Sequence, residues 1–336
     1  MADRLPISLL LGGLLLATSA GAAEPPHSRW QARYSDAPSA TEYWDLSARM
    51  DSGHHLFARF FITNEGPGIH TAAGIGTLIQ PDGAIVPFRW GRRKGDWTLS
   101  ADGLLIDIAS LVLDMRGQPR RFELDSDKRG IKIHLSFESR GRSVSGDNTP
   151  VPHHFDVLEM AAPIEGSIWV KGMPEAVRTH GVVTLTHAWM DTAESDLVQR
   201  QVEVVFTHSD MAVYATDFRG PNGTAWGWLA VRERGEIVAH ASVRERGFGE
   251  ALGGPSRYPL PRTVRLDAEG ALLTMTVARE LLRLNPIEVV PQPFRFVLSL
   301  KMNPQKISAT GDCALKLGSR EIRGGCSTAV TYLNPF

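Results

Sequence analysis

Residues 181–191 have the sequence GVVTLTHAWMD, and their β-branched and apolar first half predicts a β-strand. Successive side chains of a strand point to opposite faces, so His187, Trp189 and Asp191 share one face. That face combines a group that can carry a proton, an aromatic wall and a carboxylate. We expect it to line a site if it faces a barrel interior. If it meets solvent or a neighbouring sheet, it is a packing surface.

The same strand-and-turn pattern continues outward along the chain. Tight-turn sequences recur between alternating apolar and polar runs, among them Asp51-Ser52-Gly53, Pro81-Asp82-Gly83, Pro221-Asn222-Gly223 and Ala268-Glu269-Gly270. Glycine in such turns adopts positive φ without steric cost. Helix signals are scarce, and the clearest, at 278–282, follows a strand-like run. Short consecutive hairpins without helical crossovers predict an all-β protein of antiparallel barrels or sandwiches.

Two breaks divide the chain near its middle. Residues 143–152 are polar and rich in turn formers, and Gly172-Met173-Pro174-Glu175 forms a second break. We therefore expect an N-terminal β-domain over 24–175 and a C-terminal β-barrel over 176–336, each of an ordinary domain size. The Gly/Pro-rich stretch 247–261 is either a lid over a barrel mouth or a plain surface loop.

The N-terminus has the three parts of a secretory signal peptide. A weakly basic start is followed by the apolar run Leu5–Leu16 and by small residues, which predicts a signal peptide over 1–23 with cleavage after Ala22 or Ala23. The alternative is an uncleaved anchor, although the run is shorter than the ~20 residues of a membrane span. No second run approaches that length. We expect a periplasmic or extracellular protein without an integral span, and leave association with a membrane surface open.

The two cysteines, Cys313 and Cys326, lie close together near the C-terminus. A disulfide is the natural expectation in an exported protein, and their spacing is not the C-x-x-C of a redox pair. Closing a loop of this size stabilises by about 3 kcal/mol in the chain-entropy model.

Charge and motifs exclude several functional classes. The formal net charge of −1, without a block of Lys or Arg, argues against nucleic acid as a partner. The chain lacks a nucleotide-binding loop and a nucleophile elbow, and we expect no cofactor. The pairs His54-His55 and His153-His154 suggest a metal only weakly, because neighbours in a strand face opposite ways. We therefore expect no metal site.

Several short motifs resemble one superfamily, the lipocalin-like proteins that include carotenoid 1,2-hydratase (hydroxyneurosporene synthase) and the fungal survival-factor proteins. The motifs are Tyr43-Trp44, Phe57-Ala58-Arg59-Phe60-Phe61, Thr63-Asn64-Glu65, Asp127-Lys128-Arg129-Gly130, His187-x-Trp189, and Trp226-Gly227-Trp228 with Gly235. The resemblance covers most of residues 40–330. It implies two tandem lipocalin-like β-domains with an apolar cavity, and the His187 strand would open the second domain.

The resemblance also implies activities. Members of this superfamily bind lipids or act without cofactors on apolar substrates, by hydrating isoprenoid double bonds or by cyclisation. In the hydratases that this chain resembles, the strand that corresponds to the His187 strand carries Asp-His-x-Trp-Gly. This chain has Thr186 in place of the acid and Met190 in place of the glycine. They also carry a closely spaced Tyr and Asp on the next strand. Tyr214 and Asp217 match this pair with one extra residue between them.

An acid-catalysed hydration needs a protonated acid beside the alkene and a wall that tolerates a carbocation. Burial raises the pKa of a carboxyl group, and aromatic faces stabilise cations. Asp217 or Asp191 would donate the proton, His187 would activate water, and Trp189 and Tyr214 would form the wall. Alternatively, Asp217 only begins a turn.

Tryptophans supply the candidate ligand contacts. Trp226 and Trp228 share a strand face and, with Trp189 and Trp44, would line an apolar pocket or simply fill a core. The sequence favours an exported protein that binds an apolar lipid or isoprenoid in a β-barrel cavity. The alternatives are a hydratase or related cyclase, and a structural envelope protein whose pockets are filled by its own side chains.

Overall fold

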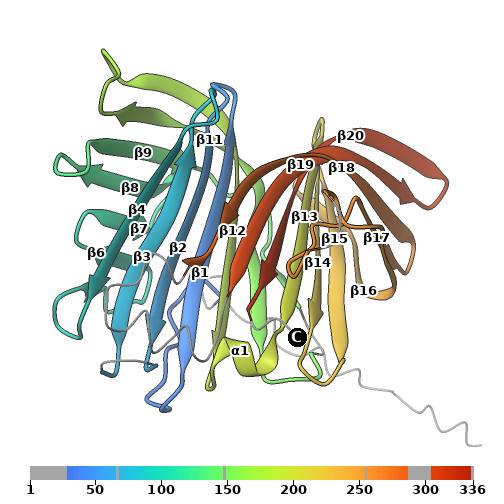
Figure 1. Cartoon of the computed structure of the whole chain (residues 1–336), viewed down its shortest axis with the longest axis horizontal. Coiled ribbons are helices and arrows are strands. Elements are labelled where there is room, and N and C mark those ends of the chain that lie inside the picture. The colour runs from blue at the N-terminus through green and yellow to red at the C-terminus, as the bar shows by residue number, and fades with distance from the viewer. Residues whose placement is uncertain (1–28, 66–67, 147–148, 254–255, 287–303, 334–336) are drawn as a thin grey trace, which may run out of the picture.

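The computed structural model describes residues 29–65, 68–146, 149–253, 256–286 and 304–333. The predicted signal peptide lies outside these residues. The described chain is almost entirely β-strand, with one short helix, α1 (Glu194–Leu197), and it contains no helix long and apolar enough to cross a membrane. The described strands form a curled sheet and a closed barrel, and none of them pairs from one to the other (Figure 1). The predicted all-β fold is confirmed.

The first sheet has twelve strands. They are β1 (Thr41–Met50), β2 (His55–Thr63), β3 (Thr71–Ile79), β4 (Ile85–Arg92), β5 (Thr98–Leu99), β6 (Leu105–Ile108), β7 (Leu111–Asp114), β8 (Arg120–Ser126), β9 (Ile131–Phe137), β10 (Val144–Ser145), β11 (His154–Val170) and β12 (Val177–Met190). Their order is β4-β3-β2-β1-β12-β11-β9-β8-β7-β6-β5, with β10 beside β11. The sheet curls until its arms meet across one core. A Cβ at Gly74 on β3 would lie 2.1 Å from the Leu111 side chain on β7, so a larger residue here would force that leucine to shift.

The second sheet closes into an eight-stranded antiparallel barrel. Its strands follow in chain order: β13 (Arg200–His208), β14 (Met211–Arg219), β15 (Ala225–Glu233), β16 (Glu236–Phe248), β17 (Thr263–Ala268), β18 (Ala271–Leu284), β19 (Gln305–Leu317) and β20 (Arg320–Tyr332). Buried apolar side chains from these strands form a core inside it. The predicted disulfide is confirmed, and it joins Cys313 on β19 to Cys326 on β20 within that core.

Strand β12 belongs to the first sheet, whereas its sequence suggested that it belongs with the C-terminal barrel. We expected the His187 strand to open the C-terminal domain that begins at residue 176. Instead β12 pairs along its length with β1 and β11 of the first sheet. The change of sheet falls between Met190 and Arg200, where α1 forms the link.

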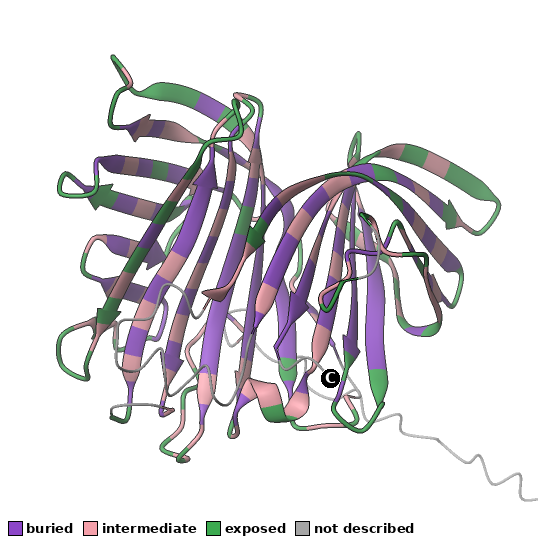
Figure 2. Ribbon diagram, viewed as in Figure 1, coloured by how far each residue is buried: buried purple, intermediate pink, exposed green. Residues whose placement is uncertain are grey.

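The strands between the two cores are buried on both faces. β2 alternates between buried and half-buried residues, as expected for a strand with one covered face, whereas eight consecutive residues of β14 are buried. Figure 2 shows this continuous burial along the strands in the middle of the molecule. β14 turns one face to the barrel core and the other to the first sheet. The outer wall of the barrel is therefore interior on this side.

The stretch after β16 packs on the barrel. Leu260 is buried, Leu252 and Tyr258 contact the barrel core, and the Tyr332 hydroxyl donates to the Pro259 carbonyl at 2.6 Å. The described part of 247–261 is therefore packed against the barrel core and is not a free surface loop.

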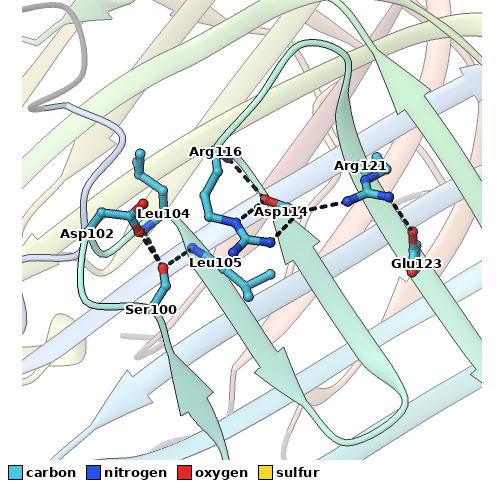
Figure 3. A network of polar contacts seen from close by, with 8 residues as sticks. All are labelled: Ser100, Asp102, Leu104, Leu105, Asp114, Arg116, Arg121 and Glu123. Carbon is cyan, nitrogen blue, oxygen red and sulfur yellow. Dashed lines mark hydrogen bonds and ion pairs between the residues drawn. The ribbon is translucent and has the colours of Figure 1, made fainter.

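A polar network ties together the hairpins at the far arm of the first sheet (Figure 3). Asp114 at the end of β7 accepts hydrogen bonds from Arg116 at 2.9 and 3.0 Å and from Arg121 at 3.0 Å. Hydrogen bonding from Arg116 lowers the pKa of Asp114 far below its ordinary value. Ser100 nearby bonds the Leu105 amide, which fixes the turn before β6.

Candidate functional site at the sheet–barrel interface

The first sheet and the barrel pack through a third cluster of buried apolar residues, distinct from their own cores. We call this surface the interface. Its large members are Tyr43, Phe155, Met160, Met190, Tyr214, Phe218, Trp226 and Trp228. The rings form a continuous series, since Tyr214 lies 5.4 Å from Trp228 and 6.4 Å from Phe155 between ring centroids. The predicted ligand-binding residues Trp226 and Trp228 thus face the sheet–barrel contact.

A cavity of about 80 Å³ lies within this interface, and we call it the interface cavity. Its polar lining includes Asp45, Thr184 and Thr186 from the sheet, and Glu203, Tyr214 and Lys306 from the barrel. Ser47, which is exposed, also lines it and marks the side nearest to solvent. Among the predicted site residues only Tyr214 lines this cavity.

Half-buried Glu203 and fully buried Tyr214 form a pair on the barrel side of the cavity. They are diagonal neighbours on the paired strands β13 and β14, where Tyr214 lies opposite Val205, and the Tyr214 hydroxyl donates to Glu203 Oε1 at 2.5 Å. Burial raises the pKa of the Glu203 carboxyl group and raises that of Tyr214 well above its ordinary value. A raised pKa beside a cavity is the direction of shift that suits a carboxyl group to act as a general acid.

A network of charges lies on the sheet side. Arg59 donates to both oxygens of Asp45 at 2.6 and 2.7 Å, and Lys306 crosses from β19 to reach the same carboxylate at 3.3 Å. Burial opposes ionisation of Asp45, but the two cations hold its pKa below the ordinary value. Arg59 also contacts Glu194 of α1 at 3.4 Å, and Glu194 accepts the Tyr43 hydroxyl at 2.6 Å. The network links the sheet, the helix and the barrel around the cavity.

His187 lies on the other face of β12. Its ring stacks on Trp44 at 4.5 Å, and Trp44 belongs to the core of the first sheet, whereas the neighbouring Thr186 lines the interface cavity. Nε2 lies 2.7 Å from Glu42 Oε1, and Nδ1 donates to the Arg29 carbonyl at 2.8 Å. These contacts fix the segment that precedes β1. His187 therefore faces away from the interface cavity.

Trp189 shares the His187 face, as the alternation predicted, with the two rings 4.9 Å apart. It also stacks on His154 at 5.0 Å. Asp191 follows the end of β12, is exposed, and accepts a hydrogen bond from the Ser35 hydroxyl at 2.5 Å. The predicted set on this strand therefore surrounds the N-terminal segment of the described chain. Of the four predicted ligand-binding tryptophans, Trp44 and Trp189 lie on this side.

Tyr214 and Asp217 do not share a site. They are three residues apart on β14 and so face opposite ways. Asp217 lies on the inner side of the barrel wall, fully buried, with Arg246 at 2.5 Å and Arg200 at 3.5 Å. Burial raises its pKa, and the two guanidinium groups oppose that shift. Asp217 is an ion-pair partner within the barrel in this structure, separated by the wall from the interface cavity.

The sequence did not single out Glu203, Lys306 or Asp45. A lone charged residue within an alternating strand is typical of a solvent-facing position, and both Glu203 and Asp45 alternate with apolar neighbours. In the described part of the chain, no group of three or more His, Cys, Asp or Glu side chains is arranged to hold a metal ion.

Comparison with known proteins supports the fold. No protein-family model matches the sequence, and no curated protein matches it. A solved structure assigned as an AttH, from Nitrosomonas europaea, is similar at a TM-score of 0.63 and 13% identity, over 88% of this chain and 94% of that chain. CghA in complex with Sch210972 is similar at a TM-score of 0.62 and 10% identity, over 88% and 89%. At such identities the likeness shows a shared fold across most of both chains.

Proposed function

We propose that this protein binds an apolar molecule of the lipid or isoprenoid class at the interface between the curled sheet and the barrel. One observation carries the proposal: the interface cavity places polar groups, Glu203, Tyr214 and Lys306, at the end of a continuous aromatic surface. A ligand whose apolar body lies against the aromatic rings and whose polar end lies in the cavity would match both features. Pockets of this composition are typical of small-molecule sites between domains.

The size of the cavity indicates how binding would occur. At about 80 Å³ it is smaller than the roughly 300–1,000 Å³ typical of ligand pockets. An isoprenoid would therefore have to move the sheet and the barrel apart. Among the strands that the structure describes, no pairing crosses the interface, so such an opening breaks none of their ladder hydrogen bonds. The interior of the barrel, as far as the chain is described, is occupied by its own apolar side chains, which favours the interface over the barrel.

Two further observations are compatible with the proposal. The disulfide suits an oxidising compartment, which supports export to the periplasm or beyond. CghA, whose fold this chain shares, has been solved with Sch210972. The superfamily resemblance of the sequence motifs favours a lipid or isoprenoid as the bound class.

Native mass spectrometry of protein purified from the periplasm, followed by solvent extraction, tests the proposal. We expect a defined lipid or isoprenoid mass on the wild type. Ala329 lines the cavity from β20, so Ala329→Trp should fill it and remove the bound mass. Thr276→Trp, at an exposed position of β18, is the matched control and should retain it. Circular dichroism would verify that both variants are folded.

Two results would count against binding at the interface. Retention of the ligand by Ala329→Trp would place it elsewhere. A wild type without bound mass, and without uptake from a lipid extract, would favour a structural role in the envelope.

A second candidate function is an acid-catalysed hydration, which the raised pKa of Glu203 favours. The Glu203 proton would add to one carbon of an isoprenoid double bond, and water would add to the resulting cation and return a proton to the carboxylate. Tyr214 and Trp228 would present aromatic faces to that cation. Incubation with an isoprenoid in ¹⁸O-labelled water should yield a labelled alcohol, and Glu203→Gln should abolish it. Ligand bound without any labelled product would leave a binding protein.

A further inference from the structure

His153 occupies an unusual position in the interface, beside Phe218 and Trp226 of the barrel. It directly precedes β11 and is fully buried. Within the described residues, neither of its ring nitrogens has a hydrogen-bond partner, and the same holds for the indole nitrogen of Trp226 on β15. Buried polar atoms are paired in the great majority of cases, so unpaired groups that adjoin one another indicate a missing partner.

The two groups lie close together among aromatic rings. The ring centroids of His153 and Trp226 are 6.2 Å apart, and Phe218 lies 5.0 Å from His153 and 5.3 Å from Trp226. Phe155 completes the enclosure at 6.1 Å from His153. His153 and Phe155 come from the sheet side, and Phe218 and Trp226 come from the barrel. The enclosure is therefore built across the same contact as the interface cavity.

An aromatic path connects this enclosure to the cavity. Phe155 lies 5.3 Å from Phe218 and 6.4 Å from Tyr214, and Tyr214 lines the cavity. An elongated ligand with one end in the interface cavity would follow these rings toward His153. The hydrogen-bond partner that His153 and Trp226 lack would then be an atom at the far end of the ligand.

The chemistry of the two groups narrows the class of that partner. Burial lowers the pKa of His153 to about 3, so its imidazole is neutral and offers one donor and one acceptor. A carboxylate or phosphate would lack a free cation here, because Trp226 and a neutral imidazole supply only neutral donors and the nearby Arg59 is already paired with Asp45 and Glu194. A metal ion would need further ligands, and the described residues contain no such cluster. A neutral oxygen remains, which can accept from the indole and bond the imidazole.

We propose that His153 and Trp226 form a subsite for a neutral oxygen, a hydroxyl or a carbonyl, at the far end of the ligand. The inference rests on the proposed function and specifies its ligand as an elongated apolar molecule with an uncharged oxygen at one terminus. The subsite discriminates between oxygenated and hydrocarbon ligands, because a hydrocarbon leaves both polar groups unpaired.

Competition binding with the C20 alcohol geranylgeraniol and the corresponding C20 hydrocarbon tests the subsite. Loss of a hydrogen bond to a buried group corresponds to about tenfold in affinity, so the wild type should prefer the alcohol by roughly that factor. His153→Phe should reduce the preference to about one while the hydrocarbon still binds within roughly twofold of wild type. His154→Phe is the matched control. His154 is the exposed neighbour and should keep the preference.

The outcomes separate the subsite from the proposed function. If the wild type binds both ligands equally, or if His153→Phe keeps the preference for the alcohol, the subsite is wrong and binding at the interface stands. If the wild type binds neither ligand, both proposals fall. An experiment on the unmodified protein covers the case in which His153→Phe does not fold. The ¹⁵N resonances of the His153 ring should shift on addition of the alcohol and not of the hydrocarbon, and equal responses would overturn the subsite.

Discussion

Substitution of Asp217 by Asn distinguishes a structural carboxylate from a catalytic one. Asp217 is fully buried in the barrel wall and contacts Arg246 at 2.5 Å and Arg200 at 3.5 Å. The asparagine amide would keep the shape of the side chain and remove the charge that both guanidinium groups face. We therefore expect Asp217→Asn to weaken the barrel without affecting ligand binding at the interface.

The expected loss of stability depends on how exposed the two arginine partners of Asp217 are. Breaking a fully buried ion pair by removing one member costs about 3–5 kcal/mol. The side chains of Arg200 and Arg246 are 15% and 25% exposed, so they can recover some hydration when Asp217 is replaced. We expect a loss of about 3 kcal/mol, at the lower end of this range. For a chain of 336 residues, with an unfolding entropy of about 2.1 cal/mol/K per residue, that corresponds to a Tm lower by roughly 4–5 °C.

Thermal and urea unfolding of purified variants would measure the effect. Asp267→Asn is the matched control, because Asp267 lies in the same barrel and pairs at 3.4 Å with Arg265, which is 54% exposed. Its replacement should change stability by less than about 1 kcal/mol. An Asp217→Asn protein that is as stable as the wild type, yet loses a hydration activity present in the wild type, would refute this reasoning. It would restore Asp217 as the proton donor.

Two titrating carboxyl groups and the disulfide supply three other tests. Burial raises the pKa of Glu203 above its ordinary 4.5, so the folded protein keeps a proton that the unfolded chain has lost, and stability falls as pH rises through that interval. Urea titrations at a series of pH values should show that Glu203→Gln removes this slope, and an unchanged slope would contradict the assignment. Asp114 has a lowered pKa, so Asp114→Asn should reduce the free energy of unfolding by about 1 kcal/mol at neutral pH. The difference in Tm between this variant and the wild type should shrink as pH falls below 3.8. A difference independent of pH would argue against the Arg116 interaction. Replacing Cys313 and Cys326 together by Ser should lower stability by about 3 kcal/mol in urea titrations, and no loss would show that the strand pairing alone holds β19 to β20.

The sequence was sufficient for features that depend on local pattern. Alternation and turn residues predicted an antiparallel all-β chain, and Cys313 and Cys326 predicted their disulfide. The alternation also placed His187 and Trp189 on one face, as their 4.9 Å ring contact shows. Each of these inferences uses only residues that are close together in the chain.

The site depends on contacts between distant segments and was only partly accessible. Both faces of β12 and β14 are buried, so a strand pattern cannot say which face meets which core. For that reason His187 was expected in the second domain and lies in the first sheet, and Tyr214 and Asp217 were grouped although the barrel wall separates them. Glu203 was not predicted because its outward-pointing side chain is covered only by the first sheet, which leaves it half-buried, and that contact joins segments distant in the sequence.

Photocrosslinking with a diazirine-bearing isoprenoid tests most directly where the ligand lies. Adjacent residues of one strand face opposite sides of the barrel wall, so mapping the labelled residue by peptide mass spectrometry distinguishes the two sides. Binding at the interface predicts labels on Val205, Ser308 and Ala329, which line the interface cavity. Labels on their neighbours Val204, Ile307 and Val330, which belong to the barrel core, would contradict the account and place the ligand inside the barrel.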